Sequence, residues 1–417
     1  MEKSRKPKIR FKGYTDDWEQ RELGEVYQKI RNAFVGTATP YYVKEGHFYL
    51  ESNNVKDGQI NRNSEIFIND EFYENQKDKW LHTNDIVMVQ SGHVGHTAVI
   101  PENLDNTAAH ALIIITNPSE KICPYFVNYQ FQAPEAKIGI DNITTGNTIK
   151  HILASEMKKF DIQVPIYEEQ RCISKFLVHL DNLITLHQRK LDKLINVKKS
   201  MLEKMFPKQG STVPEIRFSG FTNDWEQRKL GEFGKATGGI SIESEFSEDG
   251  IYKVISIGSY SENSIYNDQG IRAVKSDKTS NRVLNKNDLT MILNDKTTSG
   301  NIIGRVLLIE KSGIYVYNQR TERIEINKNE YDPLFLYEML NAPNVREKII
   351  KQAQGNTQIY VNWSAITMLD YTIPSKKEQV KIGQFLHSIG NLITLHQRVK
   401  SLKIDIITKK GVLNNGI

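Results

Sequence analysis

The octapeptide Asn182-Leu-Ile-Thr-Leu-His-Gln-Arg189 decides the fold, because the same eight residues return as Asn391 to Arg398. A letter-for-letter repeat so far along the chain indicates a tandem duplication. Both copies lie inside a long helical pattern. The duplication therefore predicts two equivalent helices, one in each half of the chain, that can pair with each other.

Apolar or core-compatible residues recur at three- and four-residue spacing through both helical patterns, the first of which runs from about Glu168 to Met205. So narrow and long a stripe is typical of a coiled-coil seam. The alternative is that each helix packs separately on its own globular half. The expected seam residues are Ile173, Phe176, Leu177, Leu180, Leu183, Ile184, His187, Leu191, Leu194, Val197, Met201 and Met205, and Ile382, Phe385, Leu386, Ile389, Leu392, Ile393, His396, Val399, Leu402, Ile406 and Leu413.

A second repeat lies outside the helices. Pro7-Lys-Ile-Arg-Phe-Lys-Gly-Tyr-Thr-Asp-Asp-Trp18 corresponds to Pro214-Glu-Ile-Arg-Phe-Ser-Gly-Phe-Thr-Asn-Asp-Trp225, and the second copy directly follows the first helix. If that copy caps the end of the first helix, the N-terminal copy is free to cap the end of the second. This layout predicts that the two helices are antiparallel.

Between these segments, short strand patterns alternate with turns, which is typical of mixed globular domains. The expected strands are His47 to Glu51, Glu65 to Ile68, Ile86 to Gln90, Thr97 to Ile100, His110 to Thr116 and Asp161 to Val164, then Tyr252 to Ile257, Asp288 to Leu293, Gly304 to Ile309, Gly313 to Ile326 and Asp370 to Ile373. The expected short helices are Tyr125 to Phe131, Ala154 to Lys158, Leu334 to Leu340 and Val345 to Gln354.

The predicted fold class is α+β, with two pseudo-symmetric mixed domains joined by two long antiparallel helices that form a coiled coil. The predicted order is an N-terminal segment (1–18), a first domain (19–165), a first spacer helix (166–207), a linker that repeats the N-terminal segment (208–225), a second domain (226–374) and a second spacer helix (375–417). The scaffold patterns of the halves agree, whereas their loops differ in length and composition.

Composition narrows the class of protein. The 417 residues carry a formal net charge of +5, which permits a polyanionic partner without requiring one. The two cysteines, Cys123 and Cys172, lack the spacing of a disulfide framework or a zinc site. Because the longest apolar runs are only strand-sized, we expect a cytoplasmic protein that is not inserted in a membrane.

Signatures of catalysis are lacking in the sequence. It contains no phosphate-binding Gly-x4-Gly-Lys-Ser/Thr loop, no His-Glu-x-x-His pair, no Gly-x-Ser-x-Gly elbow and no Asn-Pro-Pro-aromatic tetrad. Glu135-Ala-Lys137 has the Glu-x-Lys spacing of restriction nucleases but no clear acidic partner on a preceding strand. His93 and His96 share a glycine-containing loop without a third metal ligand nearby. We therefore expect no metal site and no catalytic residue.

The ordered motifs resemble the specificity subunit of type I restriction-modification systems, HsdS. The resemblance covers both halves: Trp-Glu-Gln-Arg-x-Leu-Gly-Glu at the start, Gly-Asn-Thr near the end, Pro165 or Pro374 followed by Glu-Gln, and the octapeptide on a long helix. It implies that each domain is a target recognition domain for one part of a split DNA sequence. The paired helices would then be a spacer that docks other subunits.

The resemblance also implies the partners: double-stranded DNA, two modification (methyltransferase) subunits and restriction (translocase and nuclease) subunits. This chain would hold no cofactor. S-adenosylmethionine, ATP and Mg would act in the partner subunits.

Two histidines, His187 and His396, lie on the expected helix seam. From that position we expect them to fix the register of the helices rather than to take part in catalysis.

Residues that distinguish bases pair with donors and acceptors on base edges, so the reading loops should be rich in polar side chains. The candidate DNA-binding residues of the first half are Gln90, Ser91, His93, His96, Asn147, Thr148 and Lys150. Those of the second half are Asn294, Lys296, Thr297, Thr298, Arg305, Asn356, Thr357 and Gln358.

Two other functions stay open at this point. The chain could be a duplicated coiled-coil scaffold whose globular halves bind proteins without DNA specificity. It could also be a self-contained nuclease or methyltransferase, in which case the purified chain would act on DNA with magnesium and S-adenosylmethionine alone.

Overall fold

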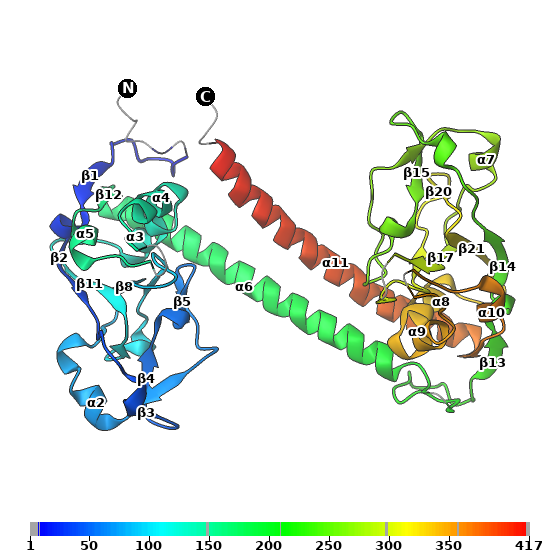
Figure 1. Ribbon diagram of the computed structural model, residues 1–417, viewed down its shortest axis with the longest axis horizontal. Coiled ribbons are helices and arrows are strands. Elements are labelled where there is room, and N and C mark those ends of the chain that lie inside the picture. Colours follow the sequence, from blue (N-terminus) through cyan, green and yellow to red (C-terminus); the bar gives the residue numbers. More distant parts are fainter. Residues whose placement is uncertain are drawn as a thin grey trace. The chain divides into compact units, whose positions relative to one another are not determined.

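The computed structural model describes residues 7, 9–146, 150–208, 210–296, 299–356 and 358–413, with backbone only for 399–413. It divides into two compact units, one of residues 1–185 with 408–417 and one of residues 186–407. Each unit contains one mixed domain of sheets and short helices together with parts of the long helices (Figure 1). The predicted α+β class with two mixed domains is confirmed.

The first domain is built on the antiparallel sheet β2-β11-β8-β9, beside a second sheet of order β10-β4-β7-β3. Its strands are β1 (Glu19–Glu22), β2 (Tyr27–Asn32), β3 (Tyr42–Val43), β4 (His47–Leu50), β5 (Val55–Lys56), β6 (Gln59–Ile60), β7 (Ile66–Ile68), β8 (Ile86–Val89), β9 (Thr97–Val99), β10 (Ala108–Ala109), β11 (Leu112–Pro118) and β12 (Asp161–Val164). Its helices are α1 (Leu23–Val26), α2 (Asp70–Glu74), α3 (Pro124–Phe131), α4 (Pro134–Asn142) and α5 (Ala154–Lys158).

The central strand β8 is apolar throughout because both of its faces are buried. Ile86 and Met88 belong to a core shared with α3, α4 and α5. Val87 and Val89 belong to a different core, which is shared with β4 and β10. Successive side chains point to opposite faces of a strand, so one uninterrupted apolar run supplies two cores.

The second domain repeats this plan with sheets β14-β21-β17-β19 and β16-β15-β20. Its strands are β13 (Glu226–Lys229), β14 (Gly234–Gly238), β15 (Tyr252–Ile255), β16 (Arg272–Ala273), β17 (Leu289–Ile292), β18 (Asn294–Asp295), β19 (Val306–Leu308), β20 (Tyr315–Tyr317), β21 (Thr321–Ile326), β22 (Ile359–Tyr360) and β23 (Asp370–Ile373). Its helices are α7 (Asp277–Ser280), α8 (Pro333–Asn341), α9 (Pro343–Ile350) and α10 (Trp363–Thr367).

Two of the expected elements are corrected. The single strand expected over residues 313–326 is two strands, because a turn in which the Thr321 N–H donates to the Asn318 carbonyl separates β20 from β21. These strands lie in different sheets. The helix expected to reach Gln354 ends at Ile350, since Gln354 instead pairs with Tyr360.

The strands β1 and β13 were not expected. Each consists of four polar residues with no apolar alternation, so no strand signal is present. They pair antiparallel with β12 and β23, the strands that precede the two long helices. Their backbones therefore close each domain at the point where its long helix begins.

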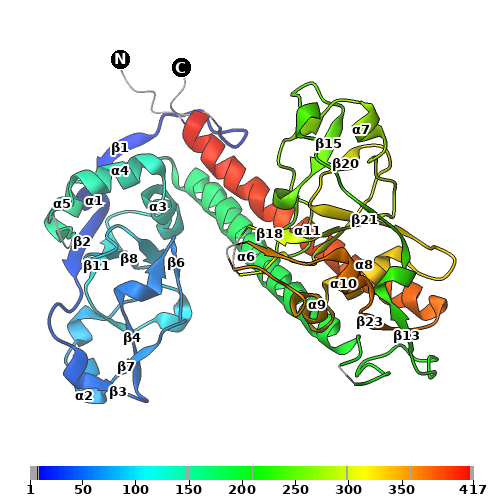
Figure 2. The same cartoon turned by 45° about the vertical axis from the view of Figure 1, so that its right-hand side comes forward.

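The long helices are α6 (Tyr167–Lys204) and α11 (Lys376–Leu413). Within the second unit, His187 contacts His396 through their Nδ1 atoms at 3.0 Å, and Leu191 packs with Ile389 and Ile393. Farther along α6, Met201 and Leu202 pack on the core that contains Ile382 and Leu386. Numbers rise on one helix as they fall on the other, so this part of the pair is antiparallel as predicted (Figure 2).

The seam is narrower than predicted. Phe176, Leu183, Val197, Phe385 and Leu392 are exposed rather than buried in it. The two phenylalanines have a different partner: the rings of Phe11 and Phe218, one from each copy of the repeated segment, lie edge-on to Phe176 and Phe385, with centroids 5.8 and 5.7 Å apart. For Val399, Leu402, Ile406 and Leu413, the seam prediction lies outside the described side chains.

The repeated segment, residues 9–18 and 216–225, docks on the first turn of each long helix. Arg10 donates from Nε and Nη2 to the carboxylate of Glu169 at 2.8 and 2.6 Å. Arg217 makes the same pair of bonds to Glu378, at 2.7 and 2.8 Å. Both carboxylates are buried, so these ion pairs explain why Arg and Glu recur in the two motifs.

The neighbouring glutamines complete each helix start. Gln170 donates to the Pro165 carbonyl and accepts from the Cys123 N–H. Gln379 likewise donates to the Pro374 carbonyl and accepts from the Asp332 N–H. The linker copy also reaches the end of the first helix, where the Ile216 N–H donates to the Lys204 carbonyl at 3.0 Å, as predicted. The matching contact expected at the end of the second helix lies outside the described side chains.

We predict that Glu378→Gln lowers the melting temperature of the second domain by several degrees, because it leaves the half-buried guanidinium of Arg217 without its anionic partner. Glu169→Gln should do the same to the first domain. Glu215→Gln is the matched control, since the Lys208–Glu215 pair is exposed. Differential scanning calorimetry measures all three, and equal melting curves for Glu378→Gln and the control would contradict the prediction.

Candidate nucleic-acid interface

The loop after β8 is a tight connection, residues 90–96, that leads back into β9. The Val89 N–H donates to the His96 carbonyl at 2.8 Å, and the Gly95 N–H donates to the Val89 carbonyl at 3.1 Å. Gly92 and Gly95 have φ of +79° and +85°. A positive φ is least unfavourable for glycine, so these residues let the chain reverse; between them His93 is exposed and Val94 packs on the domain core.

The segment on either side of the Gly-Asn-Thr motif, residues 145–146 and 150–152, lies directly beside this loop. Thr145 and His151 exchange two backbone hydrogen bonds of 2.8 Å, and His151 forms a bridge with Ser91. The Ile152 N–H donates to the Gln90 carbonyl at 3.0 Å, and the Gly92 N–H donates to the Lys150 carbonyl at 3.1 Å. The structure thus brings together two loops that are about 55 residues apart in the chain.

The second domain builds the same frame. Its strands β18 and β22 place Asn294 opposite Tyr360, and Gln354 exchanges backbone hydrogen bonds of 2.8 and 2.9 Å with Tyr360. Asn294 and Tyr360 correspond to Ser91 and His151. We name the paired loops the first reading frame (residues 90–96 and 145–152) and the second reading frame (residues 294–305 and 354–361).

The longer loop of the second reading frame is held from inside the domain. The buried guanidinium of Arg346 donates to the carbonyls of Gly300, Asn301 and Ile303 at 2.6 to 2.9 Å. Burial lowers the pKa of Arg346 to about 10, so the group is still cationic at neutral pH. The carboxylate of Asp295 accepts from the Ile302 N–H at 3.2 Å. These bonds hold the backbone of residues 300–303.

A glycine in each frame is required by close packing. A Cβ on Gly95 would lie 2.9 Å from Cγ2 of Ile140, and one on Gly304 would lie 2.6 Å from Cγ2 of Ile349. Ile140 and Ile349 lie on the equivalent helices α4 and α9. Both glycines also have positive φ, at +85° and +70°. The reading loops are thus seated on the domain by the same contact in both halves.

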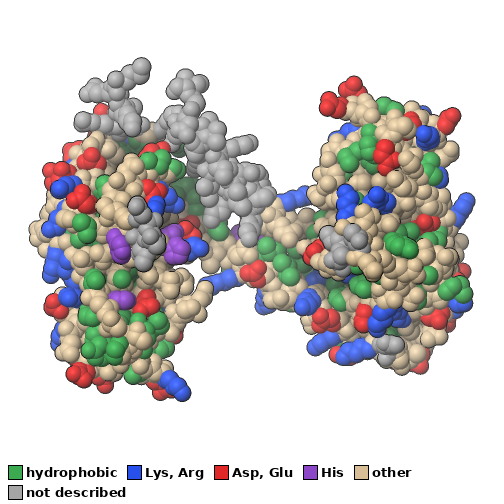
Figure 3. All heavy atoms as spheres, viewed as in Figure 1, with side chains coloured by type: hydrophobic (Ala, Val, Ile, Leu, Met, Phe, Trp, Pro, Cys, Tyr) green, Lys and Arg blue, Asp and Glu red, His purple; other side chains and the backbone are tan. Residues whose placement is uncertain are grey.

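Most candidate residues in the described part of the chain lie on these frames. His93, Lys150, Lys296, Asn356 and Gln358 are exposed, whereas Gln90, Ser91, His96 and Asn294 are half-buried. Asn147, Thr148, Thr297, Thr298 and Thr357 lie outside the described residues. Histidine side chains gather on the first domain in the face that Figure 3 shows. Polar side chains of different kinds therefore line two frames of the same construction.

Arg305 is the last residue of its loop, and its side chain is bonded within the domain. Its guanidinium is half-buried and donates to Ser264 Oγ and to the Asn301 carbonyl, both at 3.3 Å. Burial lowers the pKa of Arg305. Neither acceptor is among the candidate residues of the second half.

His96 corresponds to Arg305 in position but stays within its frame. Its Nδ1 accepts from the Asp57 N–H at 3.4 Å, and burial lowers its pKa. Both effects favour the neutral imidazole at neutral pH. His96 can therefore offer a hydrogen bond there, but not a fixed positive charge.

Two residues of the frames, His151 and Tyr360, were not among the candidates from the sequence. Both are exposed, and each pairs with the opposite loop of its frame. Both lie five residues after the glycine of a Gly-Asn-Thr motif, but this spacing alone does not indicate pairing with the other loop. Neither residue belongs to a recognisable motif, so only the strand pairing identifies them.

The described ranges contain neither a metal site nor a nuclease-like pair of residues on a strand. They contain no group of three or more His, Cys, Asp or Glu side chains that could hold a metal ion. Glu135 and Lys137 lie on helix α4 and not on a strand as in a nuclease site. No helix among the described residues is long and apolar enough to span a bilayer.

Comparison with known proteins identifies the family. The model of the type I restriction modification DNA specificity domain matches the chain twice, at residues 15–196 and 222–403. The chain belongs to this family. The two matches coincide with the two halves of the duplication, so the chain is a specificity subunit with two target recognition domains, as the sequence motifs predicted, and not a catalytic subunit.

Relatives of known class agree with this assignment. The MjaVIII specificity subunit of a type I restriction enzyme from Methanocaldococcus jannaschii is 23% identical over 92% of this chain and 89% of its own length. The EcoBI specificity subunit from Escherichia coli is 21% identical over 46% of this chain and 41% of its own length. The crystal structure of the S subunit from M. genitalium has the same fold, with a TM-score of 0.59 at 15% identity over 97% of both chains.

We predict that Gly95→Ala and Gly304→Ala each destabilise their domain by about 2 to 3 kcal/mol, since a Cβ there adds a clash to a strained φ. Gly92→Ala is the matched control: its φ is similar, but a Cβ would meet no atom within 4 Å, so it should cost only about 1 kcal/mol. Urea unfolding gives the free energies. Equal values for Gly92→Ala and Gly95→Ala would show that the contact with Ile140 is unimportant.

Proposed function

We propose that each target recognition domain of this specificity subunit reads one element of a bipartite duplex sequence through its reading frame. The observation that carries the proposal is that one backbone frame is built twice and lined with different side chains. The domains are taken as residues 19–165 and 226–374. A common scaffold with different loops is suited to reading two different elements.

The chemistry of the frames supports this assignment. Bases in the major groove differ in their pattern of hydrogen-bond donors and acceptors, and amides, hydroxyls and imidazoles can match both. The base-reading candidates of the first frame are Gln90, Ser91, His93, His96, Asn147, Thr148 and His151. Those of the second are Asn294, Thr297, Thr298, Asn356, Thr357, Gln358 and Tyr360.

Cationic residues have a separate role. Lys150 and Lys296 are exposed on the frames, where a lysine can hold a phosphate without distinguishing bases. Arg305 would support the loop from behind. Its half-buried guanidinium and its contacts with Ser264 and Asn301 support a positioning role for it.

The partners are proposed from the family assignment and the duplication. Two modification subunits would dock, one for each copy of the helix and domain, and restriction subunits would join this assembly. S-adenosylmethionine would be held by the modification subunits, and ATP and Mg by the restriction subunits. This chain would supply specificity to both reactions.

The function is tested with the full chain assembled with its modification subunits, after methylation mapping has identified the recognised sequence. His151→Ala should reduce discrimination at one element by about 10-fold, the order of one good base contact, and leave the other element unchanged. Tyr360→Ala should show the reverse. Discrimination is measured with duplexes that carry single base changes in either element. If either variant affects both elements equally, the frames are not separate readers.

The same assay includes the lysines. Lys150→Ala and Lys296→Ala should weaken binding to all sequences alike and reduce the slope of log affinity against log salt by about 1. Lys377→Ala is the control, because this exposed lysine lies at the start of α11 and outside both frames. A salt slope that stays at the wild-type value in both frame variants would argue against phosphate contacts there.

We predict two modification subunits per chain, because the duplicated helix and domain offer the same surface twice. The Arg189→Ala and Lys190→Ala double variant removes exposed charges from α6 alone and should weaken one docking site more than the other. Native mass spectrometry of the complex at saturation counts the subunits. A single modification subunit per wild-type chain would contradict the prediction.

A further inference from the structure

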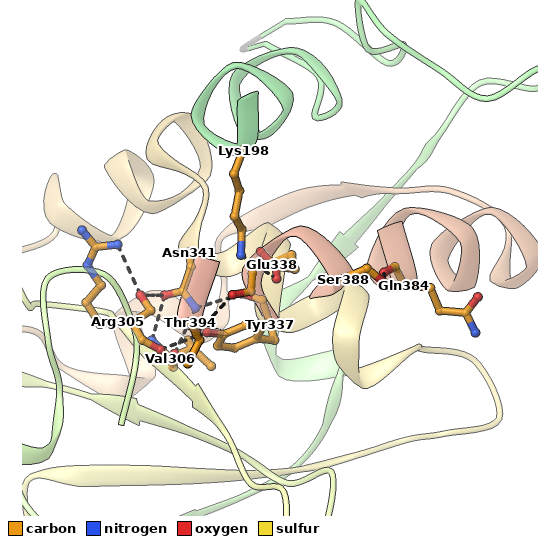
Figure 4. A network of polar contacts seen from close by, with 11 residues as sticks. Lys198, Arg305, Val306, Tyr337, Glu338, Asn341, Gln384, Ser388 and Thr394 are labelled. Carbon is orange, nitrogen blue, oxygen red and sulfur yellow. Dashed lines mark hydrogen bonds and ion pairs between the residues drawn. The ribbon is translucent and has the colours of Figure 1, made fainter. Parts of the chain in front are cut away.

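A buried ion pair connects the second domain to the first long helix. Glu338 of α8 is 2% exposed and accepts a 2.9 Å hydrogen bond from Lys198 Nζ of α6 (Figure 4). The Lys198 side chain is itself only 18% exposed. Burial raises the pKa of Glu338, whereas the adjacent Lys198 lowers it. Both groups are largely shielded from water, so removing either partner would leave the other charge without its ion-pair partner.

The second long helix makes room for this pair. A Cβ on Gly390 would lie 2.9 Å from Lys198 Nζ and 4.0 Å from Glu338 Oε1. Glycine is a poor helix former, yet Gly390 lies within α11 with no break in the helix. The missing side chain therefore lets Lys198 pass α11 and reach the domain behind it.

In the first half, different residues form the corresponding contact between the domain and a long helix. Glu338 and Tyr129 are both the sixth residue of their helices, which begin at Pro333 and Pro124. Gly390 and Asp181 both directly precede the repeated octapeptide. Tyr129 donates to Asp181 at 2.7 Å. The first domain is thus bonded to its own long helix at this position, whereas the second domain is bonded to the other one.

Contacts lead from this ion pair to the second reading frame. Asn341, one turn beyond Glu338 on α8, accepts from the Val306 N–H at 3.0 Å and donates to the Val306 carbonyl at 2.9 Å. It also accepts from Ser264 Oγ, which in turn accepts from Arg305. Arg305 ends the reading loop and Val306 begins β19. A shift of α8 would therefore move the base of that loop.

We propose that Lys198 and Glu338 are positioning residues that set the orientation of the second domain on the helix pair, and thereby the bases that the second reading frame reaches. The inference rests on the proposed function, because its consequence is read out as base discrimination. It applies to the second domain alone, since the equivalent position of the first domain is held by Tyr129 and Asp181.

The test compares single and paired replacements in the full chain with its modification subunits. Lys198→Met and Glu338→Gln each remove one charge and should lower the folding equilibrium constant of the second domain about 100-fold. The pair Lys198→Met with Glu338→Leu removes both charges and should restore the melting temperature. Discrimination at the element read by the second frame should nonetheless stay about 10-fold below wild type, while the other element is unaffected. Lys199→Met, an exposed neighbour, is the control.

Tyr129→Phe is the mirror variant, because it removes the corresponding bond of the first half. It should affect only the element read by the first frame. The positioning role is refuted if the paired Met and Leu variant discriminates the second element as wild type does, or if both elements lose discrimination alike. If wild type itself shows no bipartite discrimination, the proposed function fails instead.

Hydrogen exchange provides a readout that needs no DNA. In the paired variant, amides of α8 and of residues 299–306 should exchange at least about 10-fold faster, because α8 has lost its fixed contact with α6. Amides of α3 should exchange as in wild type. Unchanged exchange over residues 299–306 would overturn the inference even if discrimination could not be measured.

Discussion

The bidentate ion pair between Arg10 and Glu169, repeated by Arg217 and Glu378, is the constraint on which each half depends. It ties a segment that precedes the domain to the helix that follows it. The same helix turn carries the glutamine that bonds the Pro165 or Pro374 carbonyl. Because a buried carboxylate needs a partner of fixed geometry, each long helix can begin at only one place relative to its domain. Each reading frame therefore belongs to a domain whose position relative to the start of its long helix is fixed.

The frames show how one scaffold can carry two different sets of side chains. The backbone pairing of Ser91 with His151 and of Asn294 with Tyr360 is equivalent, as is the glycine contact with Ile140 or Ile349. These contacts use backbone groups and one small residue, so they place no demand on the side chains at the loop tips. Recognition residues can therefore differ between the halves without loss of the fold.

The halves are not equivalent everywhere. At the contact between domain and long helix, a neutral donor and a carboxylate in the first half are replaced by a buried charge pair and a glycine in the second. A duplicated chain can diverge in this way once its two halves no longer need to be identical. The ion pair makes the first long helix a structural part of the second domain.

The sequence by itself determined the duplication, the α+β class, the two long helices and the two loops of each reading frame, because repeats and apolar spacing are local signals. The prediction from sequence missed β1 and β13, because their residues are all polar and show no alternation of apolar and polar side chains. It was also wrong for exposed seam positions such as Phe176, which packs on Phe11. Only the tertiary structure decided that the two loops of a frame lie together, that His151 and Tyr360 belong to them, and that the guanidinium of Arg305 bonds to Ser264 and Asn301. Those relations depend on pairing between segments far apart in the chain, for which no local pattern exists.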